Sequence, residues 1–280
     1  MLKQIVSNKQ AMSGLIVILI LCVMIIFADY LVPNDPLKVN LSEKFTQTSW
    51  QYPLGTDQFG RCLLSRLIYG CRYSLGISFI VIGSVLTISF VIRTISGYYG
   101  GLIDRLVVGI CNIFMSFPPM VLVLALVGLF GSGGKNLVFA MVFSLWAGYT
   151  KIIRGYVLNQ KNRKYIEAAK VFGTPSLVII IKHIIPNIIS PILVYTFLSM
   201  GQIILMISGF SFLGLGVQLP KPEWGAMLYE AKTFLYTNPE LLIYPAVMVI
   251  ITSVAFNIFG DALRDILDPL DSKNIAKGLK

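Results

Sequence analysis

The chain has 280 residues, of which 56% are hydrophobic and only 13% are charged, and its mean hydropathy is +0.77. Soluble globular domains carry about 25% charged residues, so this composition excludes an ordinary soluble domain and indicates an integral membrane protein. The formal net charge of +10 would suggest a nucleic-acid partner for a soluble protein. In a membrane protein the distribution of charge matters more than its sum, and we expect no nucleic-acid partner.

Uncharged runs predict six membrane-spanning helices, because a hydrocarbon core of about 30 Å requires roughly 20 helical residues. In chain order the runs are Gln10–Ala28, Tyr73–Ile92, Leu106–Gly134, Asn136–Thr150, Ile184–Pro220 and Leu241–Gly260. The fifth run is too long for one crossing, and its glycine-rich second half predicts a bend or a partly inserted hairpin after the helix. The expected fold class is therefore an all-α membrane protein with six transmembrane helices.

The positions of Lys and Arg predict how these spans are oriented. With a cytoplasmic N-terminus, most of the 23 Lys and Arg residues fall in segments on the cytoplasmic side. Since cytoplasmic loops are enriched in these residues, we expect both termini in the cytoplasm. We divide the chain into a first helix with an external loop (residues 1–72), a core transmembrane domain (73–270) and a cytoplasmic tail (271–280).

Two features near the first two spans are informative. In the external loop, leucine and isoleucine recur at helical spacing, at Leu63, Leu64, Leu67 and Ile68, which predicts an amphipathic helix against the outer membrane face. Arg93 ends the second run, and we interpret it as marking the cytoplasmic interface, with a buried gating role as the alternative.

The stretch between the fourth and fifth spans, residues 161–187, is polar and basic between long apolar runs. We expect Asn162 to cap a short helix that ends at Gly173, because glycine tolerates positive φ. Thr174 and Pro175 then predict the start of a second short helix. In the first helix one face gathers Tyr165, Ala168, Ala169 and Phe172, whose small alanines would let a partner approach closely.

Motifs for catalysis are absent from the sequence. There is no H-E-x-x-H or G-x-S-x-G pattern, and the glycine-rich segment Gly128–Asn136 fails the phosphate-loop pattern at two positions. His183 is the only histidine and has no cysteine or carboxylate cluster beside it, so a structural role is favoured over a metal site. We expect no catalytic residue, metal or cofactor in this chain.

Four motifs carry a family resemblance. Glu167-Ala168-Ala169, with Gly173 four residues further and Pro186 beyond it, resembles the cytoplasmic EAA loop of bacterial ABC importer permeases. The segments PLGTD to LSRLIYG, SFLGLGVQLPKPEWGAML and FNIFGDALRDILDPL resemble the C-type permeases of dipeptide, oligopeptide and nickel importers. Cys62 stands where those proteins usually carry Asp, which puts in doubt any cap or salt bridge made by that Asp.

The resemblance implies a type I ABC importer permease fold in the bacterial cell membrane. It implies ATPase coupling through the EAA loop, with these residues as candidates: Tyr165, Glu167, Ala168, Ala169 and Gly173. It also implies several partners: a homologous permease, two cytoplasmic ABC ATPases that bind ATP and Mg, an extracytoplasmic solute-binding protein, and membrane lipid. That receptor is expected to bind the outer segments Tyr52–Arg72 and Val217–Glu230.

Several assignments stay open in the sequence. We expect small and weakly polar residues of the fifth helix to line the translocation path, namely Ser199, Gly201 and Gln202. The charges at Asp261, Arg264, Asp265 and Asp268 predict either local ion pairs or a contact with the ATPase. Peptide, nickel and metal–metallophore importers share the motifs, so the cargo is not decided. The alternative function is a secondary transporter without ATPase partners.

Overall fold

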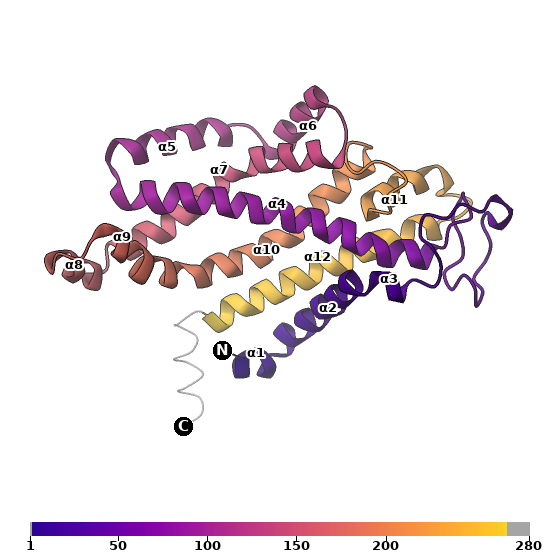
Figure 1. The fold of residues 1–280 in the computed structure, drawn as a ribbon, viewed down its shortest axis with the longest axis horizontal. Helices are drawn as coiled ribbons and strands as arrows, with labels where there is room; N and C mark the ends of the chain where they lie inside the picture. The colour runs from indigo at the N-terminus through magenta and orange to yellow at the C-terminus, as the bar shows by residue number, and fades with distance from the viewer. Residues whose placement is uncertain (1, 268–280) are drawn as a thin grey trace.

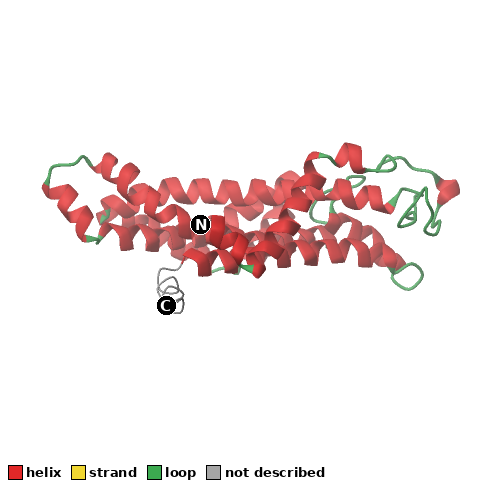
Figure 2. Cartoon of the chain, turned by 90° about the horizontal axis from the view of Figure 1, so that it is seen from below, coloured by secondary structure: helices red, strands yellow, loops and turns green. Residues whose placement is uncertain are grey.

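The computed structural model describes residues 2–267, and every regular element within that range is a helix. Long helices run side by side along the long axis of the molecule, and α8 (Lys164–Val171) and α9 (Ser176–Ile179) lie at one end (Figure 1). The irregular segment 32–62 lies at the opposite end, together with α11 (Trp224–Ala231). A view turned by 90° shows that most loop segments gather at these two ends (Figure 2).

Five helical runs are long and apolar enough to cross a membrane, and their bounds are α2 (Lys9–Ile26), α4 (Leu63–Tyr99), α7 (Gly134–Lys161), α9 through α10 (Ser176–Phe212) and α12 (Glu240–Leu267). The pair α5 (Gly101–Met115) and α6 (Pro119–Phe130) makes a sixth if it is counted as one bent span. This confirms the predicted all-α membrane fold. The remaining short helices are α1 (Leu2–Ser7), α3 (Ala28–Leu31), η1 (Leu41–Glu43), η2 (Ile180–Ile184) and η3 (Lys232–Phe234).

The second span differs from its prediction, because α4 is a single helix of 37 residues. It begins at Leu63, so the separate amphipathic helix expected against the outer membrane face is wrong. Leu63 and Leu67 are buried, and the polar Ser65 and Arg66 beside them are buried too. The helix therefore enters the protein interior at its first turn instead of lying on the membrane surface.

The third predicted span is broken. The axes of α5 and α6 differ in direction by 81°, and the break contains Pro118, with Pro119 as the first residue of α6. Proline removes a backbone donor and disfavours helical geometry in the residue before it, so a continuous helix cannot pass through this point. An uncharged run alone did not reveal the break.

The fifth span ends as predicted, with a change of direction. Helix α10 (Ile185–Phe212) stops before Gly214, whose φ is +81°, and α11 then packs back against α10. Along α10 and α12 the backbones approach closely at Gly201, where a Cβ would lie 2.8 Å from the Ser253 carbonyl oxygen. The Ser253 hydroxyl donates to the Gly201 carbonyl at 3.1 Å across the same contact. In lipid the hydrophobic effect does not drive helices together. Small residues stabilise such contacts instead, because they let the two backbones pack closely.

Four buried charges, here called the four-charge cluster, join the segment before α4 and the first turn of α4 to α11. Arg61 contacts Asp57 at 2.6 Å and Glu230 at 2.8 Å. Arg66 contacts the same two carboxylates at 3.4 and 2.6 Å. All four side chains are at most 6% exposed, and their formal charges cancel. A buried cluster of this kind is tolerated because each charge has a partner of opposite sign.

Glu223 makes a second connection at this end, as the N-cap of α11. Its carboxylate accepts from the N–H groups of Gly225 and Ala226, both at 2.9 Å, and from the Ser74 hydroxyl at 3.2 Å. Burial raises the pKa of the Glu223 carboxyl, while these hydrogen bonds oppose the shift. Because Ser74 belongs to α4, the cap fixes α11 to α4 as well as satisfying its first turn.

Candidate coupling loop and translocation cavities

The loop between α7 and α10 forms two short helices around a fixed bend. Helix α8 starts at Lys164, one residue later than expected, because Asn162 ends α7 and Arg163 is extended. Helix α9 starts at Ser176 after Pro175, so Thr174 is not its cap. The predicted caps at Asn162 and Thr174 are therefore wrong. Gly173 lies between the helices with φ of +74°, which confirms the predicted left-handed position.

Most of the predicted coupling residues lie on the accessible side of α8. Tyr165, Glu167 and Ala168 are exposed, whereas Ala169 is half-buried. The Tyr165 hydroxyl donates to the Gln160 side chain at 2.8 Å. The loop thus presents an acidic and an aromatic side chain beside a small one.

The sequence did not reveal what holds α8 in place or what it exposes most. Ile166 is 0% exposed and belongs to a buried cluster with residues of α4, α7 and α10. Val171 and Phe172 are each 86% exposed, at the end of the helix next to the bend. The spacing of Ile166 and Ala169 was the only local signal for the buried face, and the coupling prediction emphasised the alanines instead.

Tyr98 of α4 connects the coupling loop to the longest helix. The Lys161 ammonium donates a hydrogen bond to the Tyr98 carbonyl, and it lies 5.6 Å from the Tyr98 ring centroid. The Lys170 ammonium, on α8 itself, lies 5.8 Å from the same centroid. Contacts of a cation with an aromatic face contribute about 0.5–1 kcal/mol at exposed sites. The end of α4 is thereby attached both to the last turn of α7 and to α8.

His183 lies where the loop continues into α10. It belongs to η2, a five-residue π-helix, and its carbonyl accepts from the Asn187 side chain at 2.6 Å. Its ring centroid lies 6.3 Å from that of Tyr165. These contacts join α8 through η2 to the first turn of α10, and the structural role of the His183 side chain stays a prediction.

Arg93 is buried within the protein, which agrees with the burial expected in its alternative interpretation, while its place at the cytoplasmic interface and a gating role stay predictions. The side chain is 0% exposed and pairs with Asp104 of α5 at 2.7 Å. Arg154 of α7 contacts the other oxygen of the same carboxylate at 2.6 Å. We call these three residues the Arg–Asp–Arg cluster. Asp104 was not singled out in the sequence, because its partner Arg93 lies on the preceding helix across the turn at Gly100.

Two cavities are lined by α7 and α10, the long helices before and after the coupling loop. The first, of about 250 Å³, lies between the α5–α6 break, α7 and α10. The second, of about 750 Å³, lies between α7, α10 and α12. Tyr195 lines both cavities, and its ring packs edge-to-face on Tyr149 with centroids 5.0 Å apart. This aromatic pair therefore lies at the boundary of the two spaces.

The three predicted path residues lie in different surroundings. Gln202 is exposed and lines the smaller cavity, whereas Ser199 is buried. Gly201 faces α12 at the close contact described above. Nothing in the structure tests which of them meets cargo, so they stay predictions.

Among the described residues, the charges near the end of α12 form no ion pair with one another, and the expected pair of Arg264 with Asp268 stays a prediction. Arg264 forms no ion pair with Asp261 or Asp265, and Asp268 lies outside the described residues. Arg264 instead lines the larger cavity beside polar side chains of α7, including Asn159 and Gln160. The alternative contact of these charges with an ATPase stays a prediction.

Comparisons with known proteins agree with the motifs and the helical architecture. A family model described as "binding-protein-dependent transport system inner membrane component" matches residues 94–270, and one described as "N-terminal TM domain of oligopeptide transport permease C" matches residues 1–49. The chain is 36% identical over 280 residues to the metal-staphylopine import system permease protein CntC of Staphylococcus aureus, covering 100% of this chain and 97% of that protein.

The names of two further relatives state other cargo. The dipeptide transport system permease protein DppC of Alkalihalophilus pseudofirmus is 35% identical over 267 residues, covering 95% of this chain and 88% of DppC. The nickel transport system permease protein NikC of Escherichia coli is 34% identical over 263 residues, covering 94% of this chain and 95% of NikC. The chain belongs to the family of inner-membrane permease components of binding-protein-dependent transport systems.

Proposed function

We propose that this permease is the non-catalytic half of a translocation path that couples cargo import to ATP hydrolysis by partner subunits. It pairs with a homologous permease, and two cytoplasmic ABC ATPases bind ATP and Mg. The observation that carries this proposal is the coupling loop, whose Val171 and Phe172 are 86% exposed beside a bend fixed by Gly173. An exposed apolar pair on a short anchored helix is the geometry of a docking element.

The connections of α8 give the proposed coupling a route. When ATP binding draws the two ATPases together, α8 moves with the surface on which it docks. Its contacts through Ile166 and Tyr98 carry the displacement to α4, α7 and α10. The Arg–Asp–Arg cluster carries it on to α5, so the broken helix moves with α4 and α7. Switching such a two-state equilibrium from 1:99 to 99:1 requires about 5.5 kcal/mol of differential binding.

The proposed orientation places the coupling loop and both termini in the cytoplasm. An extracytoplasmic solute-binding protein then docks on the opposite end. The expected docking segments need revision, since Tyr52, Arg61 and the stretch 222–227 are buried. Trp50 and Tyr236 are 103% and 96% exposed at that end, and we propose them as receptor contacts. Aromatic side chains are enriched at the energetic centres of interfaces.

The cargo is proposed from the relatives and from the path. The named relatives import dipeptide, nickel or metal-staphylopine, and we propose that this permease carries a cargo of one of these classes. Gln202, Ser144 and the tyrosine pair are the polar residues of a mostly apolar cavity, which can admit hydrated or zwitterionic cargo without binding it tightly. The selection of cargo is left largely to the receptor.

The test is ATP turnover in nanodiscs, measured for this chain alone, for the permease pair with both ATPases, and for the full set with receptor and cargo. We expect no hydrolysis by the chain alone, basal turnover by the four-subunit complex, and stimulation by the loaded receptor. Hydrolysis by the lone chain would contradict the non-catalytic role. Cargo uptake without any ATPase would instead support the secondary-transporter alternative.

A further inference from the structure

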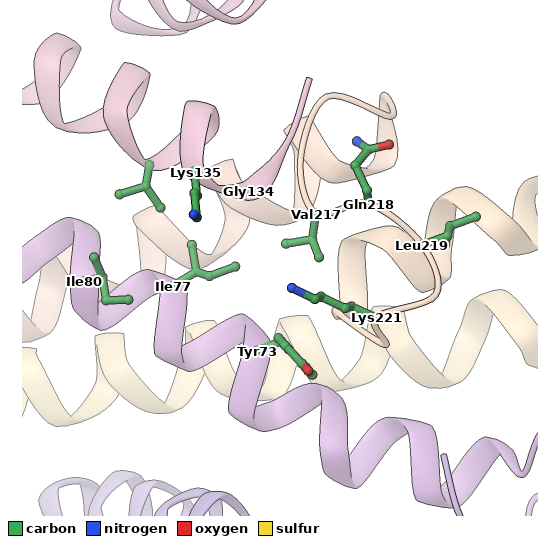
Figure 3. Close-up of a pocket in the computed structure, with 10 residues that line it drawn as sticks. Tyr73, Ile77, Ile80, Gly134, Lys135, Val217, Gln218, Leu219 and Lys221 are labelled. Atoms are coloured by element: carbon green, nitrogen blue, oxygen red, sulfur yellow. The ribbon is translucent and has the colours of Figure 1, made fainter. Parts of the chain in front are cut away.

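A third cavity, of about 560 Å³, lies at the end of the bundle opposite the coupling loop. It is bounded by α4, by the first turn of α7 and by the segment that follows α10. Ile77 and Val217 form part of its apolar wall, and Tyr73 lies at one side. Two lysines from different elements border the same space: Lys221 extends between Val217 and Tyr73, and Lys135 lies beside Ile77 (Figure 3).

The charged side chains that line this cavity are all positive. None of its lining residues is Asp or Glu, and neither Lys135 nor Lys221 forms an ion pair with a carboxylate of the described residues. The Lys221 ammonium lies 5.8 Å from the Tyr73 ring centroid, which turns it along the cavity wall. Two ammonium groups beside low-dielectric walls attract an anionic group and repel a bare divalent cation.

The backbone around Lys135 adds a partial positive charge to that of the two lysines. The glycine-rich segment that fails as an ATP phosphate loop leads directly into α7, with φ of +86° at Gly131 and +147° at Gly133. The Gly133 N–H donates to the Leu215 carbonyl at 3.2 Å, which ties this turn to the segment after α10. Helix α7 then begins without a side-chain cap, and its first residue, Gly134, lines the cavity. The positive end of a 28-residue helix therefore reinforces the two lysines.

We propose that this lysine cavity binds a carboxylate group of the cargo as the cargo leaves the receptor for the translocation path. This rests on the proposed import function and narrows its cargo to a peptide or to a metal held by a carboxylate-bearing chelator. A bare metal cation does not fit, because both lysines would repel it. A phosphate group of an anionic lipid shares the charge of a carboxylate, so the test must separate the two sources.

The experiment is lysine footprinting of the assembled complex in phosphatidylcholine nanodiscs. A membrane-impermeant amine-acylating reagent is applied at low conversion, and modified peptides are quantified by mass spectrometry. Dialanine and citrate serve as carboxylate probes, and dialanine amide is the matched probe without a carboxylate. Lys38, an exposed lysine of the external segment outside the cavity, is the internal control, and acylation of the other lysines is expressed relative to it because the α-amine of either dialanine probe also consumes reagent.

We expect either carboxylate probe to protect Lys135 and Lys221 together relative to Lys38. At a probe concentration of twice the Kd, acylation of both should fall about threefold. Lys221→Gln should raise the concentration needed to protect Lys135 about tenfold, as expected for the loss of one charge-assisted contact worth about 1.4 kcal/mol. Dialanine amide and nickel chloride should give no protection.

Each other result contradicts the proposal in a defined way. Equal protection by dialanine and its amide would exclude carboxylate recognition. Protection that appears only in nanodiscs containing phosphatidylglycerol would assign the cavity to lipid phosphate instead of cargo. No protection in any arm would remove the anion site altogether. Receptor-stimulated ATP turnover, measured in the same preparation, reports on the import function separately, so the two proposals fail independently.

Discussion

At the residue scale, two clusters of paired charges connect the helices in the interior of this permease. The Arg–Asp–Arg cluster joins α4, α5 and α7, and the four-charge cluster joins the segment before α4 and the first turn of α4 to α11. Isolated charges in a low-dielectric interior are strongly unfavourable, so removing one partner has consequences for the other.

We expect Asp104→Ala to destabilise the folded chain by about 3–5 kcal/mol, because it leaves the fully buried Arg93 without a carboxylate. The measurement is thermal unfolding followed by a thiol-reactive dye, since Cys62, Cys71 and Cys111 are all buried in the folded chain. Asp265→Ala, at an exposed position of α12, is the control and should change little. Equal melting temperatures for the two variants would contradict the role of the Arg–Asp–Arg cluster.

A second residue-scale prediction concerns the close contact of α10 with α12. Gly201→Ala should destabilise by about 1–3 kcal/mol, because the new methyl would overlap the Ser253 carbonyl oxygen at 2.8 Å. Gly209→Ala on the same helix is the matched control: it meets no atom within 4 Å, so it should be neutral or slightly stabilising. The same dye assay ranks the two, and a stable Gly201→Ala variant would show that the helices can separate there at no cost.

At the element scale, the coupling loop depends on a bend between two short helices. Only a few residue types can adopt the backbone conformation of this bend. Gly173 has φ of +74° and open space around it. A side chain added there would be disfavoured by the positive φ of the backbone and not by a steric clash with neighbouring atoms. A β-branched residue disfavours this conformation strongly, whereas asparagine adopts it readily.

Gly173→Val should therefore reduce cargo-stimulated ATP turnover several-fold by misdirecting α9, while Gly173→Asn should keep most of it. Both variants add a side chain at the same exposed place, so their difference isolates the backbone conformation. The assay is ATP turnover of the assembled complex with and without loaded receptor. Two variants with the same turnover would exclude the bend as a coupling element.

At the scale of the whole molecule, the two ends should lie on opposite sides of the membrane. A cysteine placed at Glu167 should react with an impermeant thiol reagent only from the cytoplasmic side, and one placed at Trp50 only from outside. Both positions are exposed, whereas the native Cys62 is 1% exposed and should not label from either side. Reaction of both introduced cysteines from the same side would overturn the orientation.

The sequence predicted what depends on local pattern. Apolar runs located the crossings, and the left-handed position of Gly173 followed from its place between two helix-forming segments. The burial of Arg93 was only an alternative in the sequence, because it depends on Asp104 and Arg154 meeting it from two other helices. The break at Pro118 had a local signal that counting uncharged residues ignored.

The candidate sites, like the fold, could be predicted from the sequence only in part. The candidate coupling residues were predicted from a motif and stay predictions. Ile166, which anchors α8, was missed because one buried residue in a short helix gives no clear periodicity. The path residues Ser199, Gly201 and Gln202 were chosen by polarity and size. Which of them faces a cavity depends on how α10 is rotated against α7 and α12, and the local sequence does not specify that rotation.

The length of α4 has a mechanical consequence. Its 37 residues span about 55 Å, well beyond the roughly 30 Å of a hydrocarbon core, and it contains no proline. One end carries Arg66 of the four-charge cluster, and the other carries Tyr98 against the coupling loop. A rod of this length displaces one end by about 1 Å for each degree of tilt about the other. In the proposed coupling, a rotation of a few degrees at the coupling-loop end is therefore enough to break and remake hydrogen bonds at the opposite end.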